Sequence, residues 1–451
     1  MTNYLNINKL TAGEPYVLYR KAIWIYIFLL IFEGALRKWF LPSLATPLLL
    51  IRDPIAIWLT IAGLQKGWIN NKYAKIMMIT ASISLLLTMT VGHHNLFVAL
   101  FGWRIYFFHF PMIFVMGKVL TRIDLLKIGQ FILWISIPMT ILIFIQFHSS
   151  QTAWVNMGVG GEGTAGFGGA LGYMRPPGTF SFTSGYVSFQ AVVGCYLFYY
   201  LLMNNTLPKE FQFSKIILVI LAGCYLLSIP TSISRTHFFQ TGLFLIFLFI
   251  AAIRKNKLKS KFLKFTIIAI VAGIILYFSG LGGTSLEAFT ARFEGANEVE
   301  GGVEGVIGDR YVGGLLGSLI NFKIPIFGYG IGLGTNAGAK IMGGDMYSFG
   351  FNGEVEWSRI IGECGMLLGL IIIGIRLFFA LDLWKKAYKI LIRKYDLLPW
   401  MLSAGMMLTI PQGQWAIPTN LGFCILFGGL TLASINCKIK TQKNNEYKFL
   451  L

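Results

Sequence analysis

Charge is scarce in this chain. Only 13% of its 451 residues are charged, whereas 55% are hydrophobic. Soluble domains carry about 25% charged residues, so a chain built from two or three ordinary soluble domains is excluded. No polar stretch is long enough to fold as a separate soluble domain. We therefore expect one integral membrane domain over residues 1–451, an all-α polytopic membrane protein.

Acidic residues are scarcer still. The chain has 19 Asp and Glu against 38 Lys and Arg, a formal net charge of +19. Such an excess is typical of nucleic-acid-binding proteins, but here the basic residues separate apolar segments and do not cover one polar domain. Their distribution follows the positive-inside rule of membrane proteins, and we expect no nucleic-acid partner.

Residues that bind metals and nucleotides lack the spacing such sites need. The five cysteines stand singly in apolar runs, which indicates small buried residues. The five histidines are not spaced as ligands, and no D-x-D pair is present for a metal-bound nucleotide sugar. The glycine-rich GYGIGLGTNAG (328–338) has no strand and helix around it and indicates a turn. We expect neither a metal nor another cofactor.

Long apolar runs are abundant. A bilayer core needs about 20 apolar residues per helix, and twelve runs approach that length. They are 22–40, 45–64, 75–92, 96–117, 128–147, 184–203, 214–230, 237–253, 264–281, 360–381, 397–412 and 419–436. The sequence thus predicts about twelve transmembrane helices.

Alternate gaps between these runs collect the positive charge. One set of gaps, which includes both termini, holds 26 of the 38 lysines and arginines, so we expect both termini in the cytoplasm. The other face then carries two long connections, 148–183 and 282–358. The second contains nine of the nineteen acidic residues. Loops beyond about 12–15 residues are usually functional or disordered, which favours this outer face for the functional site.

Several arginines lie on or near this outer face, against the positive-inside rule. An arginine within a span costs a few kcal/mol on insertion scales, so it is normally paired or functional, and guanidinium groups match phosphate oxygens. We expect Arg37, Arg52 and Arg292 either to pair with local carboxylates, Arg52 being next to Asp53, or to extend to the lipid headgroups. The candidates for ligand binding are Arg175, Arg235, Arg310 and Arg359, where outer loops enter or leave spans, together with Arg104 inside the fourth span.

The stretch EVEWSRIIGECGMLLGL (354–370) places three carboxylates and an arginine at the mouth of an apolar helix. Glu356, Arg359 and Glu363 are three and four residues apart, a spacing that allows ion pairing on one helical face. One interpretation is a purely structural cluster that locks helices together. The other is an active site, with Glu354 or Glu356 as a general base and Glu363 as an orienting group. A separate stripe of Gly362, Gly365 and Gly369 predicts close contact with a neighbouring helix.

Four stretches in this order resemble the O-antigen polymerase and O-antigen ligase superfamily. They are RPPGTFSFTSGYVSF (175–189), SISRTHFFQT (232–241), FGYGIGLGTN (327–336) and EVEWSRIIGECGMLLGL, over roughly the last two-thirds of the chain. EGALRKWFLP (33–42) and RDPI (52–55) also resemble a subgroup found among exopolysaccharide polymerases.

The resemblance implies a GT-C-like fold in the bacterial inner membrane with both long loops in the periplasm. It implies a metal-independent glycosyltransferase that joins undecaprenyl-diphosphate-linked oligosaccharide repeats into O-antigen, capsule or exopolysaccharide. Arg175 and Arg235, and less directly Arg310 or Arg359, would hold the diphosphate. Membrane lipids, a chain-length regulator and a flippase are the other expected partners.

One departure separates the branches of this superfamily. Ligases resemble H-N-x-x-L-x-x-x-x-E-x-G in the last element, and Glu354 occupies the place of that histidine. This favours a polymerase over a ligase that transfers the glycan to lipid A–core or another acceptor. A polysaccharide or ion transporter is the alternative from another class. It would carry charges and broken helices near mid-membrane, whereas the charges here gather on one face, with Arg104 the main exception.

Overall fold

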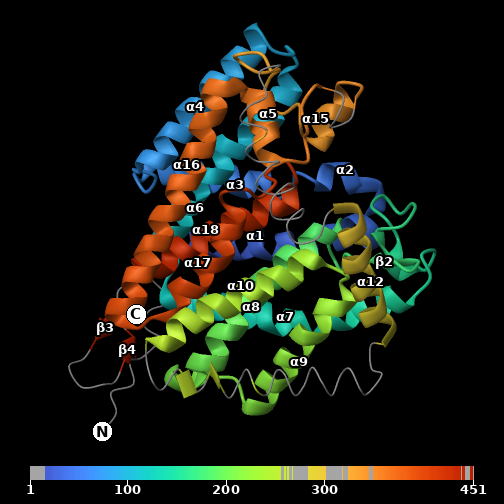
Figure 1. Ribbon diagram of the computed structural model, residues 1–451. Coiled ribbons are helices and arrows are strands. Elements are labelled where there is room, and N and C mark those ends of the chain that lie inside the picture. Colours follow the sequence, from blue (N-terminus) through green and yellow to red (C-terminus); the bar gives the residue numbers. More distant parts are fainter. Residues whose placement is uncertain are drawn as a thin grey trace.

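The computed structural model describes residues 16–254, 283–300, 324–344 and 349–437, a few positions within 259–267, residue 317, and the strands 439–441 and 447–449. The described chain is mostly helical, with two small two-stranded sheets (Figure 1). The predicted span 264–281 and the candidate Arg310 lie outside the described residues.

The first half of the chain supplies eight principal helices. They are α1 (Val17–Ala35), α3 (Asp53–Gln65), α4 (Lys72–Thr90), α5 (Leu96–Arg104), α6 (Phe110–Val119), α7 (Arg122–His148), α8 (Thr183–Met203) and α9 (Lys215–Thr231). A short α2 (Ala45–Leu48) precedes α3, and the hairpin β1 (Phe167–Ala170) and β2 (Tyr173–Arg175) lies between α7 and α8.

The second half continues with α10 (Arg235–Ile253), α12 (Gly283–Glu300), the short α15 (Asn336–Ile341), α16 (Glu356–Lys394), α17 (Leu397–Thr409) and α18 (Pro418–Asn436). The strands β3 (Ile439–Thr441) and β4 (Tyr447–Phe449) pair antiparallel at the C-terminus. Nine helices of the described chain are long and apolar enough to cross a membrane. They are the helices over 42–65, 72–90, 96–119, 122–148, 183–206, 209–231, 235–253, 356–394 and 418–436.

Local capping explains where several of these helices begin. The side chains of Asn71, Asn95 and Ser214 each accept a hydrogen bond from a backbone N–H in the first turn that follows. Thr121 and Asp124 form a reciprocal capping box at the start of α7. Each cap satisfies an N–H group that the helix itself leaves unpaired.

Two π-helical turns interrupt regular helix geometry. One, Leu36–Phe40, follows α1, and the other, Ile105–His109, joins α5 to α6. Such turns are rare and occur frequently at functional sites. Here they carry the buried polar residues Lys38, Tyr106 and His109.

The glycine stripe in α16 does not pack as predicted. Gly365 has φ 76° and ψ 172°, so the helix breaks there. A Cβ at Gly362 would clash with the Phe351 ring, and one at Gly365 would clash with the carbonyl of Ile326. The expectation of a helix–helix contact is wrong for Gly362 and Gly365, which border Phe351 and the 326–334 loop, whereas Gly369 does lie against the helical turn of Ile361. The broken turn frees the carbonyls of Gly362 and Glu363, which accept hydrogen bonds from that loop.

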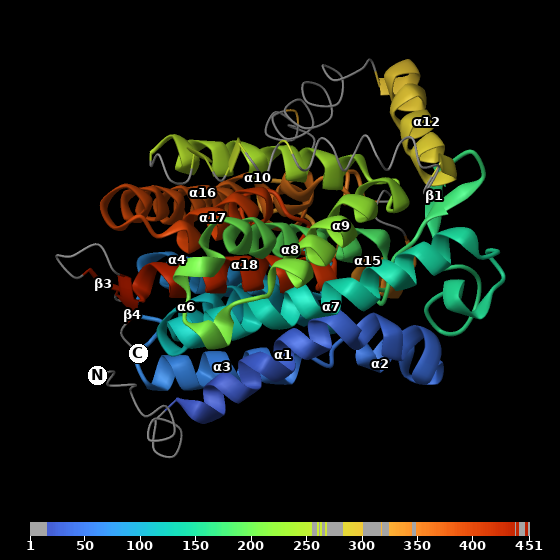
Figure 2. The same cartoon turned by 90° about the horizontal axis from the view of Figure 1, so that it is seen from below.

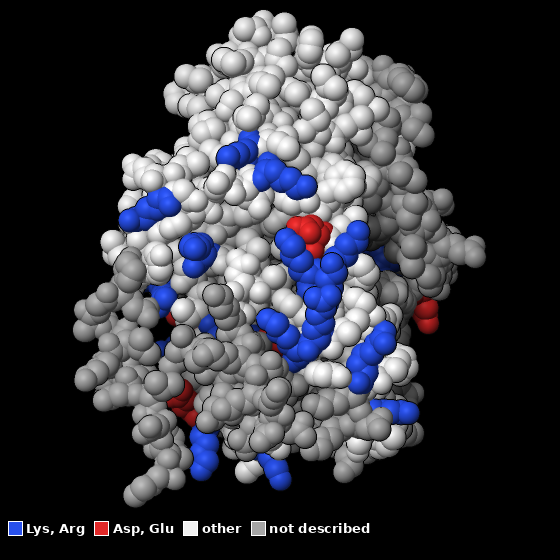
Figure 3. All heavy atoms as spheres, turned by 90° about the vertical axis from the view of Figure 1, so that its left-hand side faces the viewer, with Lys and Arg blue, Asp and Glu red and all other residues white. Residues whose placement is uncertain are grey.

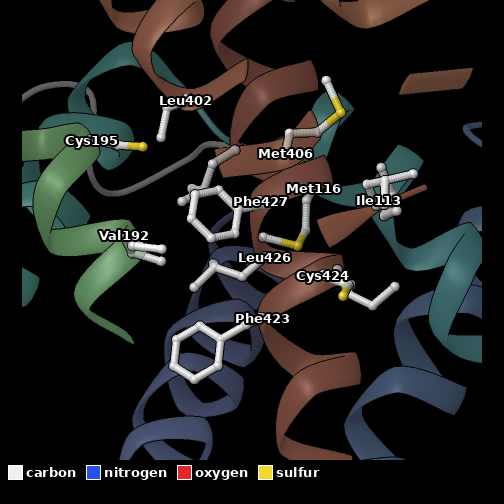
Figure 4. Packing of buried hydrophobic residues seen from close by; sticks show 14 of the residues in the cluster. Ile113, Met116, Val192, Cys195, Leu402, Met406, Phe423, Cys424, Leu426 and Phe427 are labelled. Atoms are coloured by element: carbon white, nitrogen blue, oxygen red, sulfur yellow. The ribbon is translucent and has the colours of Figure 1, made fainter. Parts of the chain in front are cut away.

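The core is centred on α18. Figure 4 shows Phe423, Leu426 and Phe427 of α18 among side chains of α6, α8 and α17. A Cβ at Gly405 of α17 would clash with the Phe427 ring, and Gly429 leaves room for Met116 of α6. In a bilayer the hydrophobic effect does not drive helices together. Small residues instead allow close van der Waals packing against a large side chain of the neighbouring helix.

The bundle has two chemically different ends. One end, termed the loop end, holds the connections 149–182, 232–234 and 410–417; the other, termed the basic end, holds 66–71, 120–121 and 395–396. Figures 1 and 2 both place the β1–β2 hairpin and α12 away from the two termini. On the face in Figure 3, lysines and arginines are spread over the middle and lower parts, and only the uppermost part is without charge.

Candidate functional site

The first element of the site is the β1–β2 hairpin, which carries Arg175. The two strands are antiparallel and joined at Leu171 and Gly172, both with positive φ (51° and 79°), as a tight two-residue turn requires. Arg175 Nε donates to the carbonyl of Gly168 at 3.1 Å, and its guanidinium lies 4.9 Å from the Phe167 ring. Arg175 is half-buried at the edge of the loop end.

The second element is the turn between α9 and α10, which carries Arg235. Ser234 caps α10 by accepting a hydrogen bond from His237 N. Ile233 is held at φ 46°, a left-handed conformation that a β-branched residue rarely adopts. Such a residue costs about 1–3 kcal/mol and persists only where its surroundings enforce it. Arg235 follows this strained position and is half-buried.

These two elements pack against each other. Ile233 is buried with Phe147 of α7 and Ala288 of α12, and Tyr173 of β2 packs on the same cluster. A Cβ at Gly169 would lie 3.0 Å from the Ile233 side chain. Arg175 and Arg235 therefore come from segments that touch, although they are 60 residues apart in the chain (235 − 175).

The carboxylate–arginine row in α16 forms a closed buried cluster. Arg359 donates to Glu356 at 2.9 and 3.0 Å, to Glu363 at 2.7 Å and to the Tyr106 hydroxyl at 3.0 Å. Arg359 is 0% exposed, Glu363 1% and Glu356 2%. Glu363 also accepts a hydrogen bond from Gly334 N at 2.8 Å. All three side chains are buried and Arg359 pairs with both carboxylates, which agrees with the structural interpretation of the row.

A residue that the sequence analysis did not single out completes this cluster. Arg376, 0% exposed, donates to Glu356 and, at 2.7 Å each, to the carbonyls of Ile410 and Gly413. Its guanidinium lies 4.0 Å from the Trp415 ring. The only sequence signal was an arginine in the middle of the apolar run 360–381. Arg376 ties α16 to the 410–417 connection.

Arg104 belongs to a second buried cluster. Asp53 accepts hydrogen bonds from Arg104 at 2.7 Å and from His109 at 3.0 Å. Arg52 pairs with Glu33 at 2.9 Å and not with the adjacent Asp53, and Arg37 lies 3.5 Å from the same Glu33. The expectation that Arg37 and Arg52 pair with carboxylates is confirmed, but the partner of Arg52 comes from α1.

Glu354 is the one candidate carboxylate that is exposed. It precedes α16, and its backbone is held at both ends: its N–H donates to Asn352 at 2.9 Å, and its carbonyl accepts from the Gln414 side chain. The backbone is thus fixed while the side chain faces outward.

A chain of contacts links Arg175 with Glu354 along the loop end. The guanidinium of Arg175 lies over Phe167, whose ring is 5.2 Å from that of Phe182. Phe182 precedes α8, where a Cβ at Gly185 would lie 2.9 Å from Thr419 of α18. The connection before α18 then reaches Glu354 through Gln414. The segments of half-buried Arg175 and exposed Glu354 are therefore connected through a series of contacts at the loop end.

Among the residues that the structure describes, no three His, Cys, Asp or Glu side chains gather as a metal-ion site. Comparisons with protein-family models and with curated proteins find no match for this chain.

Proposed function

We propose that this protein is a glycosyltransferase of the bacterial inner membrane that joins undecaprenyl-diphosphate-linked oligosaccharide repeats into a polysaccharide. The proposal rests on the four motifs that resemble the O-antigen polymerase and ligase superfamily. The observation that supports it best is the packing of the β1–β2 hairpin on the α9–α10 turn, which brings the segments of Arg175 and Arg235 together.

In the proposed reaction, Arg175 and Arg235 hold the donor's diphosphate. Forked charge-assisted hydrogen bonds from guanidinium groups suit phosphate oxygens and stabilise the charge that develops on the leaving group. A hydroxyl of the acceptor glycan attacks the anomeric carbon of the donor and loses its proton to the Glu354 carboxylate. The bond from the anomeric carbon to the diphosphate oxygen breaks, and undecaprenyl diphosphate leaves with the bonding electrons.

The proposed topology has twelve spans with both termini in the cytoplasm and a GT-C-like arrangement. The nine helices, α1, the shorter α17 and the predicted run 264–281 make up the twelve. The positive charge at the basic end supports this orientation: the last turns of α16 alone hold Lys385, Lys386, Lys389, Arg393 and Lys394. A cysteine introduced at position 343 tests it, because a membrane-impermeant maleimide should label it from the periplasm. Protection there would invert the topology.

A transporter is the second candidate, and the buried clusters favour it. Charges inside a bundle and a helix broken at Gly365 are features of transporter sites, and the structure has both. They show that charge is not confined to one face. In each cluster, however, arginines and carboxylates pair with one another, as expected if the clusters hold the helices together. Flux of labelled lipid-linked glycan into protein-containing vesicles, without a change in glycan length, would favour the transporter.

Reconstitution tests the polymerase directly. The purified protein in liposomes receives undecaprenyl-diphosphate-linked repeat units from its own host, and the products are separated on a gel. A ladder spaced by one repeat supports a polymerase. Transfer that occurs only after lipid A–core is added makes the protein a ligase, and no transfer to any acceptor contradicts both. The Arg175→Ala and Arg235→Ala proteins are the matched negative controls.

A further inference from the structure

The segment 178–181, which follows Arg175 and two prolines, lies against the end of α1. Thr179 Oγ1 donates to the carbonyl of Ile31 at 2.7 Å, and Arg37 donates to Ser181 Oγ at 3.0 Å. A Cβ at Gly34 would clash with the backbone of this segment. The segment is therefore docked by backbone contact, and it connects β2 to the start of α8.

Gly178 is the most tightly held residue of this segment. It has φ 63°, a conformation that favours glycine, and its N–H donates to Gln146 Oε1 at 2.8 Å. Its carbonyl accepts from Gln146 Nε2 at 3.3 Å and from Lys38 Nζ at 2.6 Å. Lys38 from the π-helical turn after α1 and Gln146 from α7 thus converge on the backbone of Gly178, three residues after Arg175.

Burying Lys38 at this contact costs folding free energy. Its side chain is 0% exposed, and the structure pairs it with no carboxylate among the described residues. Its ammonium lies 4.3 Å from the Trp39 ring and donates to Gly178 O. Buried charges are normally paired, because removing an unpaired ion from water costs stability. A buried lysine without a counter-charge therefore indicates a role other than stability.

We propose that Lys38 is a positioning residue of the proposed site. It fixes the Gly178 peptide, and through it the segment 175–184, so that Arg175 and the start of α8 face the diphosphate in one geometry. This inference rests on the proposed function for its consequence in catalysis, while the positioning itself can be measured without the reaction.

The experiment compares Lys38→Met, Lys38→Arg and wild type in lipid nanodiscs. Lys21→Met is the matched control, since Lys21 is an exposed lysine on α1 itself. Amide hydrogen exchange over residues 175–184 is followed by mass spectrometry, with the thermal midpoint of each protein. Lys38→Met should raise the exchange rate at least about tenfold at an equal or higher midpoint. Lys38→Arg, which keeps a charged donor, should restore part of the protection.

Polymerisation kinetics separate positioning from mere folding. Lys38→Met should raise the KM for the lipid-diphosphate donor in a protein that is stably folded. Lys21→Met should change neither this KM nor the exchange rate over residues 175–184. Unchanged exchange and unchanged KM would overturn the proposal. If Lys38→Met does not accumulate, Gln146→Leu removes the other anchor of Gly178 and should raise exchange in the same way. If Lys38→Met exchanges faster but the wild-type protein makes no polymer, the positioning by Lys38 stands and only the proposed function is contradicted.

Discussion

The guanidinium of Arg376 donates a hydrogen bond to the carboxylate of Glu356, which precedes it by 20 residues. A continuous helix would separate the two residues by about 30 Å along its axis. The contact exists because α16 turns back on itself at Gly365, so that Glu356–Cys364 packs beside the helix that follows. A Cβ at Gly369 would lie 3.1 Å from the Ile361 Cα, which agrees with this hairpin.

Gly365→Ala should destabilise the protein. The new Cβ would clash with the Ile326 carbonyl, and alanine at a positive φ is strained. We expect a lower thermal midpoint in detergent and less protein in the membrane. Gly374→Ala on the same helix is the control, because its Cβ would meet only Phe378 ring atoms at 3.9 and 4.0 Å. Equal midpoints for the two variants would argue against the hairpin.

Glu356→Leu should destabilise the protein strongly. It leaves Arg359 and Arg376 buried without their shared carboxylate, and breaking a buried pair costs about 3–5 kcal/mol. Thermal unfolding monitored by tryptophan fluorescence measures the effect. A Glu356→Leu protein with normal stability and no polymer would instead point to a catalytic carboxylate.

Glu354→Gln should leave stability unchanged and slow the reaction. The side chain is exposed, and the backbone bonds to Asn352 and Gln414 do not involve the carboxylate. A general base contributes about 10²- to 10⁴-fold, so kcat should fall by at least about 100-fold. Single-turnover kinetics with lipid-linked repeats test this, and an unaltered rate would remove Glu354 from the role of base.

Arg175→Ala and Arg235→Ala should each reduce polymer formation strongly without loss of protein from the membrane. Hydrogen bonds to charged groups contribute about 1.5–3 kcal/mol each, so losing one lowers kcat/KM by about 10- to 100-fold. Gel analysis of polymer and immunoblots of membrane fractions give the two readouts. Arg393→Ala, exposed at the basic end, serves as the control. Full activity of the Arg235→Ala protein would exclude that residue from diphosphate binding.

Stability should depend on pH through Lys38, which lies beyond α1 and outside the spanning helices. Burial lowers the pKa of Lys38 from 10.5 to about 7. Between these values the unfolded chain binds a proton that the folded protein does not, so the free energy of unfolding rises with pH. Its charged neighbours, Arg37 in the same π-helical turn and Glu33 near the end of α1, pair with each other. The midpoint advantage of Lys38→Met over wild type should therefore shrink from about pH 6 to about pH 9. A constant difference would contradict the lowered pKa.

Periodic features of the sequence were predictable because they depend on neighbours along the chain. All eleven predicted runs that fall within the described residues are helical, since a long apolar run in a low-charge chain has few alternatives. The ion pairing of Glu356, Arg359 and Glu363 also followed from spacing. Their burial did not, because it depends on Tyr106 and Arg376, which spacing cannot place.

The sequence by itself determined a multi-helix membrane protein with a basic end and a set of candidate arginines, because length, hydropathy and charge act locally. Only the tertiary structure decided which charged side chains are buried in ion pairs and which remain accessible at the loop end. Arg52 takes its partner from α1, and Gly365 reverses a helix that hydropathy predicts to be continuous. The hairpin that carries Arg175 packs on the turn that carries Arg235. Each depends on a contact between segments far apart in the chain, where packing and the cost of burying an unpaired charge select the partner.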